Sequence, residues 1–570
     1  MSESPSLSAR SYNSVLDFKS GHTPSSPLSS PLSSSAAGRN NQGWVVQKFG
    51  GTSVGKFAEE IVENIVRVFN KLNKVAVVCS ARSSNTKLEG TTSRLIRLAE
   101  LASNNQDYES LLSVIEQDHI DNCTNLIKSL AIKNHLINDI KAEIQHGREL
   151  LHACQIIGEI SPRSLDSIMS MGEKLSCLFM TALMQDHDLK AVYINLSDLI
   201  PLNYNFVNGF DDKFYQFISE EIASRINEAV SGSEEVGENG ENNDVDNDVI
   251  PVLTGYFGVV PGGLLNGVGR GYTDLCAALA AVGLQAEELQ IWKEVDGIFT
   301  ADPRKVPNAR LLESVTPEEA AELTYYGSEV IHPFTMEQVI KARIPIRIKN
   351  VENPKGKGTI IYPDNIARRG EQTPPHPPAA YETLSQSYIS LHKKRSATAI
   401  TAKQDIVVIN IHSNKKTLSH GFLAHIFTTL DKYKLVVDLI STSEVHVSMA
   451  LSIQNDQEQQ LKNAIQELKK MGEVDVTKNM TIISLVGKQM VNFIGIAGNM
   501  FKILADEQIN IEMISQGANE INISAVINEK DTLRALRSVH AQLLEGKHHL
   551  YENPESASAV DIRLEALKML

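Results

Sequence analysis

The C-terminal third of the chain repeats itself, and this repeat restricts the possible folds more than any other feature of the sequence. The segment Phe427–Ser441 recurs 74 residues later as Phe501–Ser515. Each copy has the pattern of a strand, a glycine turn, a helix, a strand, a loop, an alternating strand and a second helix. Such a succession in ~75 residues is typical of a small α+β unit of ferredoxin-like type. We therefore expect two units in tandem, over residues 399–476 and 477–570.

The region before the repeats has the pattern of a different fold. Short, continuous apolar runs such as Val75–Cys79 and Val249–Thr254 recur between segments with apolar residues at helical spacing. Strands that are buried on both faces show such runs, and their alternation with helices predicts a largely parallel sheet between two layers of helices. An α/β domain is expected over residues 43–365.

Three segments have compositions that do not suit a packed core. Residues 1–42 are rich in Ser and Pro, residues 233–248 hold seven acidic residues and no basic one, and residues 366–398 contain four prolines between positions 374 and 378. We interpret them as a disordered tail, a solvated loop insertion and a linker. A transit peptide is the alternative for the tail, and a cation-binding loop is the alternative for the insertion, although its spacing matches no calcium loop.

Charge and composition argue against several classes of protein. The 570 residues include 54 basic and 69 acidic ones, a net charge of −15, which does not suit a protein that binds nucleic acid by neutralising phosphates. No stretch approaches the ~18 consecutive apolar residues of a membrane span. Five single cysteines form no CxxC pair and suggest neither a disulfide framework nor a zinc site. We expect a cytoplasmic protein whose partners are small molecules or proteins, without nucleic acid or membrane.

The turn after the first expected strand carries the first candidate chemistry. Lys48 lies near the end of the strand Trp44–Phe49, and a helix follows the turn. Backbone amides freed by glycines, two hydroxyls and a lysine suit a phosphoryl group. A Gly-Gly turn between a strand and a helix is, however, more often only a turn. The residues of this candidate phosphate turn are Gly50, Gly51, Thr52 and Ser53.

This turn is the first of several motifs that together resemble one family. The string Lys48–Ser53 is similar to the opening signature of aspartate kinases within the amino acid kinase family. Further stretches that resemble motifs of that family follow in order: Val78–Ala81, Gly172–Ser176, Gly269–Asp274, Val295–Arg304 and Glu329–Pro333. The repeats resemble the paired ACT regulatory domains of these kinases, so the resemblance covers about residues 44–570. The tail, the acidic insertion and the long linker resemble the fungal members.

The resemblance implies a complete enzymatic function. It implies an amino acid kinase domain followed by two ACT domains, and a homo-oligomer that associates through the ACT domains. The implied reaction is ATP-dependent phosphorylation of L-aspartate to 4-phospho-L-aspartate, the first step of threonine and methionine biosynthesis. The implied regulator is a pathway end product, threonine. Mg²⁺ is expected to arrive with ATP, held by phosphate oxygens and water, without a dedicated metal site in the protein.

Chemistry and resemblance together assign the substrate residues. A site that phosphorylates one carboxylate of aspartate must hold the other carboxylate and the amino group. Arg270 suits a bidentate grip on a carboxylate, and Glu173 suits an ammonium group. Taken alone, these two residues would more often be a surface ion-pair member and a solvated helix position. The resemblance adds Ser80, Thr86 and Thr273 as substrate-binding positions, and it makes Asp274 the residue that orients the catalytic Lys48.

The nucleotide residues beyond the turn rest on the resemblance. Trp292, beside them, is expected to pack in the core. Many family members have a lysine where this chain has Glu329, so one phosphate-neutralising lysine is missing from its usual place. A substitute is expected among the remaining basic nucleotide residues. The positions that match the nucleotide region of the family are Lys293, Glu294, Phe299 and Arg304.

Equivalent loops of the two repeats are the predicted allosteric sites. They offer backbone groups, hydroxyls and amides that suit an α-amino acid at a seam between units. The alternative is that they are ordinary hairpin turns and that the repeats only dimerise. The predicted allosteric residues are Asp438, Ser441 and Thr442 in the first copy and Gln516 and Asn519 in the second.

Two rival functions remain open from the sequence alone. The same fold could phosphorylate another acceptor, such as glutamate or a nucleoside monophosphate, but Glu173, Arg270 and the ACT-like repeats together disfavour this. A catalytically silent amino-acid sensor is the rival from another class. The presence of Lys48, Arg270 and Asp274 argues against a silent protein.

Overall fold

The computed structural model describes most of the chain after the tail. All described residues belong to one compact unit, Gln42–Leu570. Four residues that the sequence singled out, Thr86, Arg270, Glu329 and Asn519, lie outside the described residues, as do 1–41, 235–248 and 363–396. The described residues are 42–83, 90–201, 204, 206, 209–234, 249–269, 271–326, 331, 333–362, 397–413, 421–443, 446–453, 457–517, 521–545 and 551–552.

The first sheet has eight strands in the order β3-β4-β2-β1-β5-β7-β8-β6. Every neighbouring pair is parallel except β7 and β8, so the expected largely parallel sheet is confirmed. Its strands are β1 (Trp44–Phe49), β2 (Lys74–Cys79), β3 (Ala191–Ile194), β4 (Ile250–Thr254), β5 (Glu288–Lys293), β6 (Ser314–Val315), β7 (Ile346–Asn350) and β8 (Thr359–Ile361).

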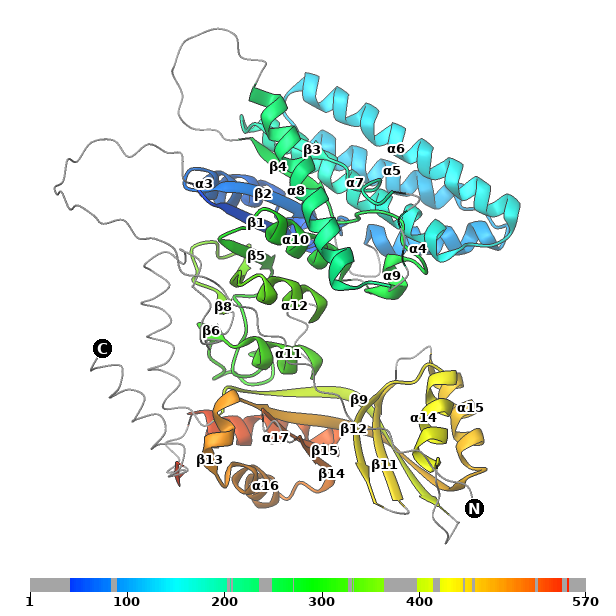
Figure 1. Ribbon diagram of the computed structural model, residues 1–570, viewed down its shortest axis with the longest axis vertical. Helices are drawn as coiled ribbons and strands as arrows, with labels where there is room; N and C mark the ends of the chain where they lie inside the picture. Colours follow the sequence, from blue (N-terminus) through cyan, green and yellow to red (C-terminus); the bar gives the residue numbers. More distant parts are fainter. Residues whose placement is uncertain are drawn as a thin grey trace, which may run out of the picture. The chain divides into compact units, whose positions relative to one another are not determined.

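Helices cover both faces of this sheet (Figure 1). In β2, Val75 and Val77 join one core and Ala76 and Val78 the other, which explains its continuous apolar run. The first core includes residues of α4 (Thr91–Ser103), α5 (Glu109–Leu126), α6 (Leu130–Ile157) and α7 (Pro162–Asp186). The second includes residues of α8 (Asp212–Glu234), α10 (Tyr272–Gly283), α11 (Pro317–Tyr325) and α12 (Pro333–Lys341). Shorter helical segments are α1 (Gly51–Lys56), α2 (Ala58–Glu60), η1 (Ile61–Val66), α3 (Arg67–Asn70) and α9 (Leu264–Gly267).

The strand order reverses direction at β1. The chain passes from β1 to β2 on one side and later returns to β5 on the other. Because β4, β2, β1 and β5 are parallel neighbours, their carboxyl ends lie at one edge of the sheet. In open α/β sheets, ligands bind outside the carboxyl ends of the strands at such a switch point.

The second sheet has six antiparallel strands in the order β10-β11-β9-β12-β15-β14. Its strands are β9 (Ala399–Ser413), β10 (Val437–Thr442), β11 (His446–Ser452), β12 (Gly472–Val486), β14 (Ile511–Gln516) and β15 (Asn522–Asn528). The accompanying helices are α14 (Phe422–Lys432), α15 (Glu458–Leu468), η3 (Lys488–Asn492), α16 (Ile496–Asp506), η4 (Glu529–Asp531), α17 (Thr532–Val539) and η5 (His540–Glu545). A small pair, β13 (Phe493–Ile494) and β16 (Tyr551–Glu552), is separate from this sheet.

The repeat seen in the sequence is visible in the backbone. Gly421 and Gly495, which precede α14 and α16, both have a φ of 86°, in the left-handed region where glycine is favoured. The hairpins β10–β11 and β14–β15 have register shifts at equivalent places, after Val437 and after Ile511. The ferredoxin-like pattern of each copy therefore corresponds to one half of the six-stranded sheet.

The two long strands serve both halves of that sheet. In β9, Val407 and Ile409 join the core with α14 and α15, whereas Ile400 joins the core with α16 and α17. Strand β12 pairs with β9 along both halves, from Gly472 to Val486. The two units are thus joined through continuous strands.

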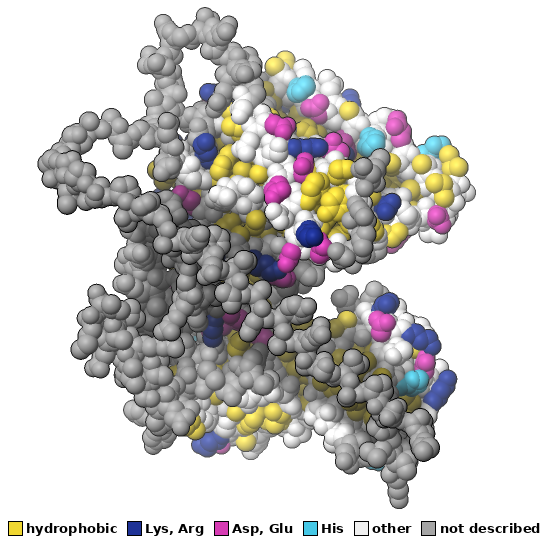
Figure 2. Space-filling model, viewed as in Figure 1, with side chains coloured by type: hydrophobic (Ala, Val, Ile, Leu, Met, Phe, Trp, Pro, Cys, Tyr) yellow, Lys and Arg dark blue, Asp and Glu magenta, His cyan; other side chains and the backbone are white. Residues whose placement is uncertain are grey.

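Basic and acidic side chains are mixed on the face of the helical layers that Figure 2 shows. Among the described helices, none has the length and apolar composition needed to cross a membrane. The five cysteines are all buried and free.

Candidate active site

Lys48 and Asp274, which the sequence paired, lie together at the switch point. Lys48 is the penultimate residue of β1, and Asp274 lies in the first turn of α10. The Lys48 Nζ atom is 2.6 Å from Oδ1 of Asp274, and the two side chains are only 10% and 13% exposed. Burial from water strengthens this ion pair and fixes the lysine at the carboxyl end of the central strand.

The turn after β1 packs closely against the loop after β2. A Cβ atom on Gly51 would lie 2.0 Å from the carbonyl oxygen of Ala81, so only glycine fits there. The amide of Ser83 donates to the Gly51 carbonyl at 2.9 Å, and the amide of Ser80 donates to the Phe49 carbonyl at 3.1 Å. Gly50 has a φ of −71°, which any residue can adopt. The close packing brings the candidate phosphate turn beside Ser80.

A side-chain hydrogen bond joins the phosphate turn to the predicted nucleotide segment. Ser53 Oγ donates to Glu294 Oε1 at 2.7 Å. Lys293 is the last residue of β5, the strand beside β1. Trp292, fully buried, stacks on Phe49 with ring centroids 6.1 Å apart, so its expected place in the core is confirmed.

Glu173 is a buried carboxylate beside this ion pair. It lies on α7 and is 2% exposed, and its Oε1 accepts a hydrogen bond of 2.5 Å from Thr273 Oγ1. Burial raises the pKa of Glu173 to about 7, while the Thr273 hydroxyl and the Lys48 charge act in the opposite direction. The amide of Tyr256 and the hydroxyl of Tyr272 also act to lower this pKa, although among the described residues none makes a well-aligned hydrogen bond to Oε2. A Cβ on Gly255, after β4, would come within 2.9 Å of that oxygen.

Asp166 is a second buried carboxylate on α7, and the sequence analysis did not identify it. It accepts hydrogen bonds from the amides of Leu264 and Leu265, the latter at 3.2 Å. These amides begin α9, in the segment that leads to Gly269 and Arg270. Asp166 lies two helical turns before Glu173, a spacing that puts both carboxylates on one face of α7. That spacing was the available sequence signal.

Phe299 and Arg304 occupy the loop after β5. Phe299 forms an isolated antiparallel bridge with Leu311. The guanidinium of Arg304 is bound to Asp302 of its own turn at 3.0 Å, and its side chain is 88% exposed. Arg304 is thus held in a solvated turn.

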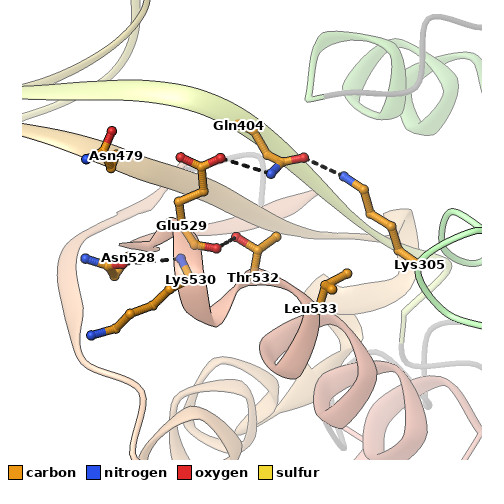
Figure 3. Close-up of a pocket in the computed structure, with 8 residues that line it drawn as sticks. All are labelled: Lys305, Gln404, Asn479, Asn528, Glu529, Lys530, Thr532 and Leu533. Atoms are coloured by element: carbon orange, nitrogen blue, oxygen red, sulfur yellow. Dashed lines mark hydrogen bonds between the residues drawn. The ribbon is translucent and has the colours of Figure 1, made fainter.

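A cavity of about 530 Å³ lies beside this loop, away from the residues described above (Figure 3). None of the predicted site residues lines it. Its wall comes from Lys305, from β9 and β12, and from the segment that joins β15 to α17.

The predicted allosteric residues differ in their exposure to solvent. The Asp438 side chain is 3% exposed and forms an ion pair with Lys403 Nζ at 2.7 Å. Ser441 and Thr442, at the end of β10, and Gln516, at the end of β14, are exposed. β10 and β14 are the two edge strands of the second sheet.

The described residues contain no group of three or more His, Cys, Asp or Glu side chains arranged to hold a metal ion. The buried charged groups described above at the switch point are instead Lys48 and the carboxylates of Asp274 and Glu173. A parallel sheet with such a buried, charged set at its switch point is typical of an α/β enzyme that binds a small polar ligand.

Comparison with known proteins specifies this class further. Residues 43–350 match the model of the Amino acid kinase family, and residues 483–543 match that of the ACT domain. The chain is 75% identical to Aspartokinase of Candida albicans over the full length of both proteins. It is 59% identical to Aspartokinase of Saccharomyces cerevisiae, with 93% of this chain and 98% of that protein covered.

Solved structures have the same fold. Aspartokinase III of Escherichia coli in complex with lysine and aspartate aligns with a TM-score of 0.65 and 23% identity, over 88% of this chain and 99% of that one. The same enzyme with aspartate and ADP aligns with a TM-score of 0.62 and 24% identity, over the same shares. The chain belongs to the aspartokinases of the amino acid kinase family, and it is an ATP-dependent kinase. The family resemblance and the fold class predicted from the sequence are confirmed.

Proposed function

We propose that this kinase transfers the γ-phosphoryl group of ATP, supplied as its magnesium complex, to the side-chain carboxylate of L-aspartate. The product is 4-phospho-L-aspartate, and the reaction is the first step of threonine and methionine biosynthesis in the cytoplasm. The observation that carries this proposal is the buried carboxylate of Glu173 beside the Lys48–Asp274 ion pair. A buried acid whose second oxygen has no well-aligned donor suits the ammonium group of an amino acid.

The proposed roles follow from the charges of the substrates. An aspartate carboxylate oxygen attacks the γ-phosphorus, the bond between that phosphorus and the β,γ-bridging oxygen breaks, and ADP leaves. No side-chain base is required because the nucleophile is already ionised. Lys48, oriented by Asp274, offsets the charge on the transferred group. Glu173 holds the ammonium and Arg270 holds the α-carboxylate. Hydroxyl donors come from Ser80 and Thr86, whereas Thr273 donates to Glu173 and contributes to substrate binding by orienting that carboxylate.

The nucleotide phosphates lie over the turn Gly50–Ser53 in this proposal, with Mg²⁺ held by phosphate oxygens and water. Glu294 and Phe299 flank the nucleotide. Of the two basic residues that could replace the lysine missing at position 329, Lys293 is favoured, because it ends the strand beside β1. Arg304 would first have to leave Asp302 and its solvated position.

Regulation is assigned to the second sheet. Residues 43–365 catalyse the reaction, and the two repeats, 399–476 and 477–570, bind threonine and join subunits into a homo-oligomer. Edge strands present unpaired backbone groups, and Ile440 of β10 and Ile514 of β14 are 37% and 47% exposed. Ser441, Thr442, Gln516 and Asn519 contribute to the threonine site, and Asp438 acts through its ion pair with Lys403.

The test is a coupled ADP-release assay with aspartate, glutamate and their amides as acceptors, with and without threonine or lysine. Hydroxylamine in a parallel reaction traps the acyl phosphate as a hydroxamate. We expect ADP release and hydroxamate with aspartate alone, and inhibition by threonine. ADP release without hydroxamate, or equal turnover of glutamate, would overturn the proposed acceptor. Inhibition by lysine and not by threonine would overturn the proposed regulator.

A further inference from the structure

The loop after β5 is anchored in the second sheet as well as in the kinase sheet. Ala301 and Val306 of this loop belong to the hydrophobic core that contains α16 and α17. The backbone carbonyl of Thr300 accepts a hydrogen bond of 2.8 Å from the amide of Ile400, in β9. A segment of the proposed nucleotide site is therefore partly built by the C-terminal unit.

A buried side-chain contact lies at the centre of this anchor. Thr300 Oγ1 is 2.8 Å from Nε2 of His540, and the two residues are 2% and 0% exposed. The amide of Arg310 donates to the same Thr300 oxygen at 2.9 Å. Arg310 also donates through Nη2 to the carbonyl of Leu544 at 2.7 Å. Residues 240 positions apart in the sequence thus share one buried hydrogen bond.

The neighbours of His540 determine the direction of that hydrogen bond. Nδ1 of His540 lies 3.0 Å from Oε1 of Glu545, without the alignment of a hydrogen bond, and the nearby carboxylate charge favours the ring proton on Nδ1. Burial lowers the pKa of His540, which keeps the ring neutral near pH 7. Nε2 is then an acceptor, and the hydroxyl of Thr300 donates to it.

Ile298, two residues before Thr300, is anchored in the kinase sheet. The amide of Ile298 donates to Thr359 Oγ1, in β8, at 2.9 Å, and the amide of Leu312 donates to the Ile298 carbonyl at 2.8 Å. Phe299 lies between these two anchors. Its backbone is therefore fixed by the bridge with Leu311 and by contacts on both sides, from the kinase sheet at Ile298 and from His540 at Thr300.

Further contacts between the loop and the C-terminal unit lie at the cavity of Figure 3. Lys305 Nζ donates to Gln404 Oε1 at 2.9 Å, and Gln404 Nε2 donates to Glu529 Oε1 at 3.3 Å. Arg537 Nε donates to the Lys305 carbonyl at 3.0 Å. These contacts are exposed and therefore weaker than the buried pair, which leaves the contact between Thr300 and His540 as the principal side-chain anchor, beside the backbone hydrogen bond from Ile400 to Thr300.

We infer that His540 is a positioning residue for the nucleotide: it holds Thr300, and through Thr300 it holds Phe299 in the ATP site. This inference rests on the proposed placement of Phe299 beside the nucleotide. His540 itself does not contact the substrates in this account. A C-terminal residue of the regulatory region thereby contributes to ATP affinity more than to aspartate affinity.

The test uses full-length variants that change one hydrogen-bonding group. Thr300→Val removes the hydroxyl with little change of shape, and His540→Leu removes the acceptor. His540→Gln retains an acceptor oxygen on a side chain of similar length. The matched control is Thr481→Val, which removes a fully buried hydroxyl that accepts from Thr532 at 2.9 Å within the same unit and leaves Thr300 and His540 unchanged. ATP and aspartate KM, kcat, ADP affinity by calorimetry and melting temperature are measured for each.

We expect Thr300→Val and His540→Leu each to raise the ATP KM and the ADP Kd at least about fivefold, with the aspartate KM changed less than about twofold. The double variant should be no worse than the more affected single one, because both remove the same contact. His540→Gln should recover at least half of the loss, and Thr481→Val should lower the melting temperature without changing the ATP KM.

Three results would overturn the inference. They are an unchanged ATP KM in folded Thr300→Val, equal changes in ATP and aspartate KM, or strictly additive effects in the double variant. If His540→Leu does not fold, Thr300→Val and His540→Gln still decide the matter. Wild-type hydroxamate formation is measured in parallel, because its absence would contradict the proposed function, whereas its presence with an unchanged ADP Kd would contradict only the role of His540.

Discussion

The carboxyl edge of the kinase sheet and the edge strands of the regulatory sheet both carry polar residues at strand ends, but they differ in burial. Lys48, Asp274 and Glu173 are almost completely buried and already contact one another or a neighbour. Ser441 and Gln516 are exposed at the ends of edge strands. The proposed catalytic edge is thus preformed, whereas the proposed regulatory edge would need a ligand or another subunit to enclose it.

The largest effect that this comparison predicts is the fall of kcat when Lys48 is replaced. Lys48→Ala removes the buried cation at the preformed edge, so kcat should fall at least about a hundredfold, because the lost interaction acts mainly in the transition state. The measurement is steady-state ADP release with saturating substrates, together with a thermal melt. The matched control is Lys56→Ala, an exposed lysine at the end of α1, which should retain the wild-type rate. Near-normal turnover of Lys48→Ala would remove this residue from the phosphoryl site.

A smaller effect, on the aspartate KM, is expected when the neighbouring carboxylate of Glu173 is neutralised. Glu173→Gln keeps the shape and an acceptor for Thr273 but loses the charge, so the aspartate KM should rise about tenfold to a hundredfold while the ATP KM changes little. The protein should melt no lower, because burial disfavours the ionised carboxylate and the neutral amide removes that cost. Glu143→Gln, which disrupts an ion pair with Lys174 on the neighbouring helices, serves as the control. A loss of stability with equal loss of both affinities would indicate a structural role instead.

The exposed edge predicts a change in regulation without a change in catalysis. Ser441→Phe and Asn519→Ala should each raise the threonine concentration for half inhibition at least about fivefold, and the rate without threonine should stay within about twofold of wild type. Inhibition curves at fixed aspartate and ATP measure this. Unchanged curves in both variants would place the regulator elsewhere. Removing the whole C-terminal region is a poorer test, because Ala301 and Val306 of the kinase part lie in its core.

The sequence predicted the local elements of the kinase edge well. Apolar runs without alternation located β2 and β4, and the ordered motifs indicated that Lys48 and Asp274 act together. Those signals are local or belong to motifs of the family. Asp166 could have been found by the same logic, since it lies two turns before Glu173 on one helix face.

The second sheet contains features that local sequence patterns do not predict. The repeat predicted two α+β units, but the sharing of β9 and β12 between two cores depends on long-range pairing. Asp438 lies at the register shift between Val437 and Leu439, and an irregularity of this kind breaks the alternation from which side-chain direction is predicted. The contact between Thr300 and His540 joins distant segments, and no local pattern encodes it.

The most direct test of the preformed edge is the pH dependence of kcat/KM for aspartate. Because the pKa of Glu173 is raised to about 7, its carboxylate is half ionised at pH 7 and about one-tenth ionised at pH 6. If the ionised form holds the substrate ammonium, wild-type kcat/KM should fall about fivefold between these pH values. Glu173→Gln retains every other titrating group and should show a nearly flat profile over this range. An equal fall in both proteins, or a flat wild-type profile, would contradict the assignment of Glu173 to the substrate.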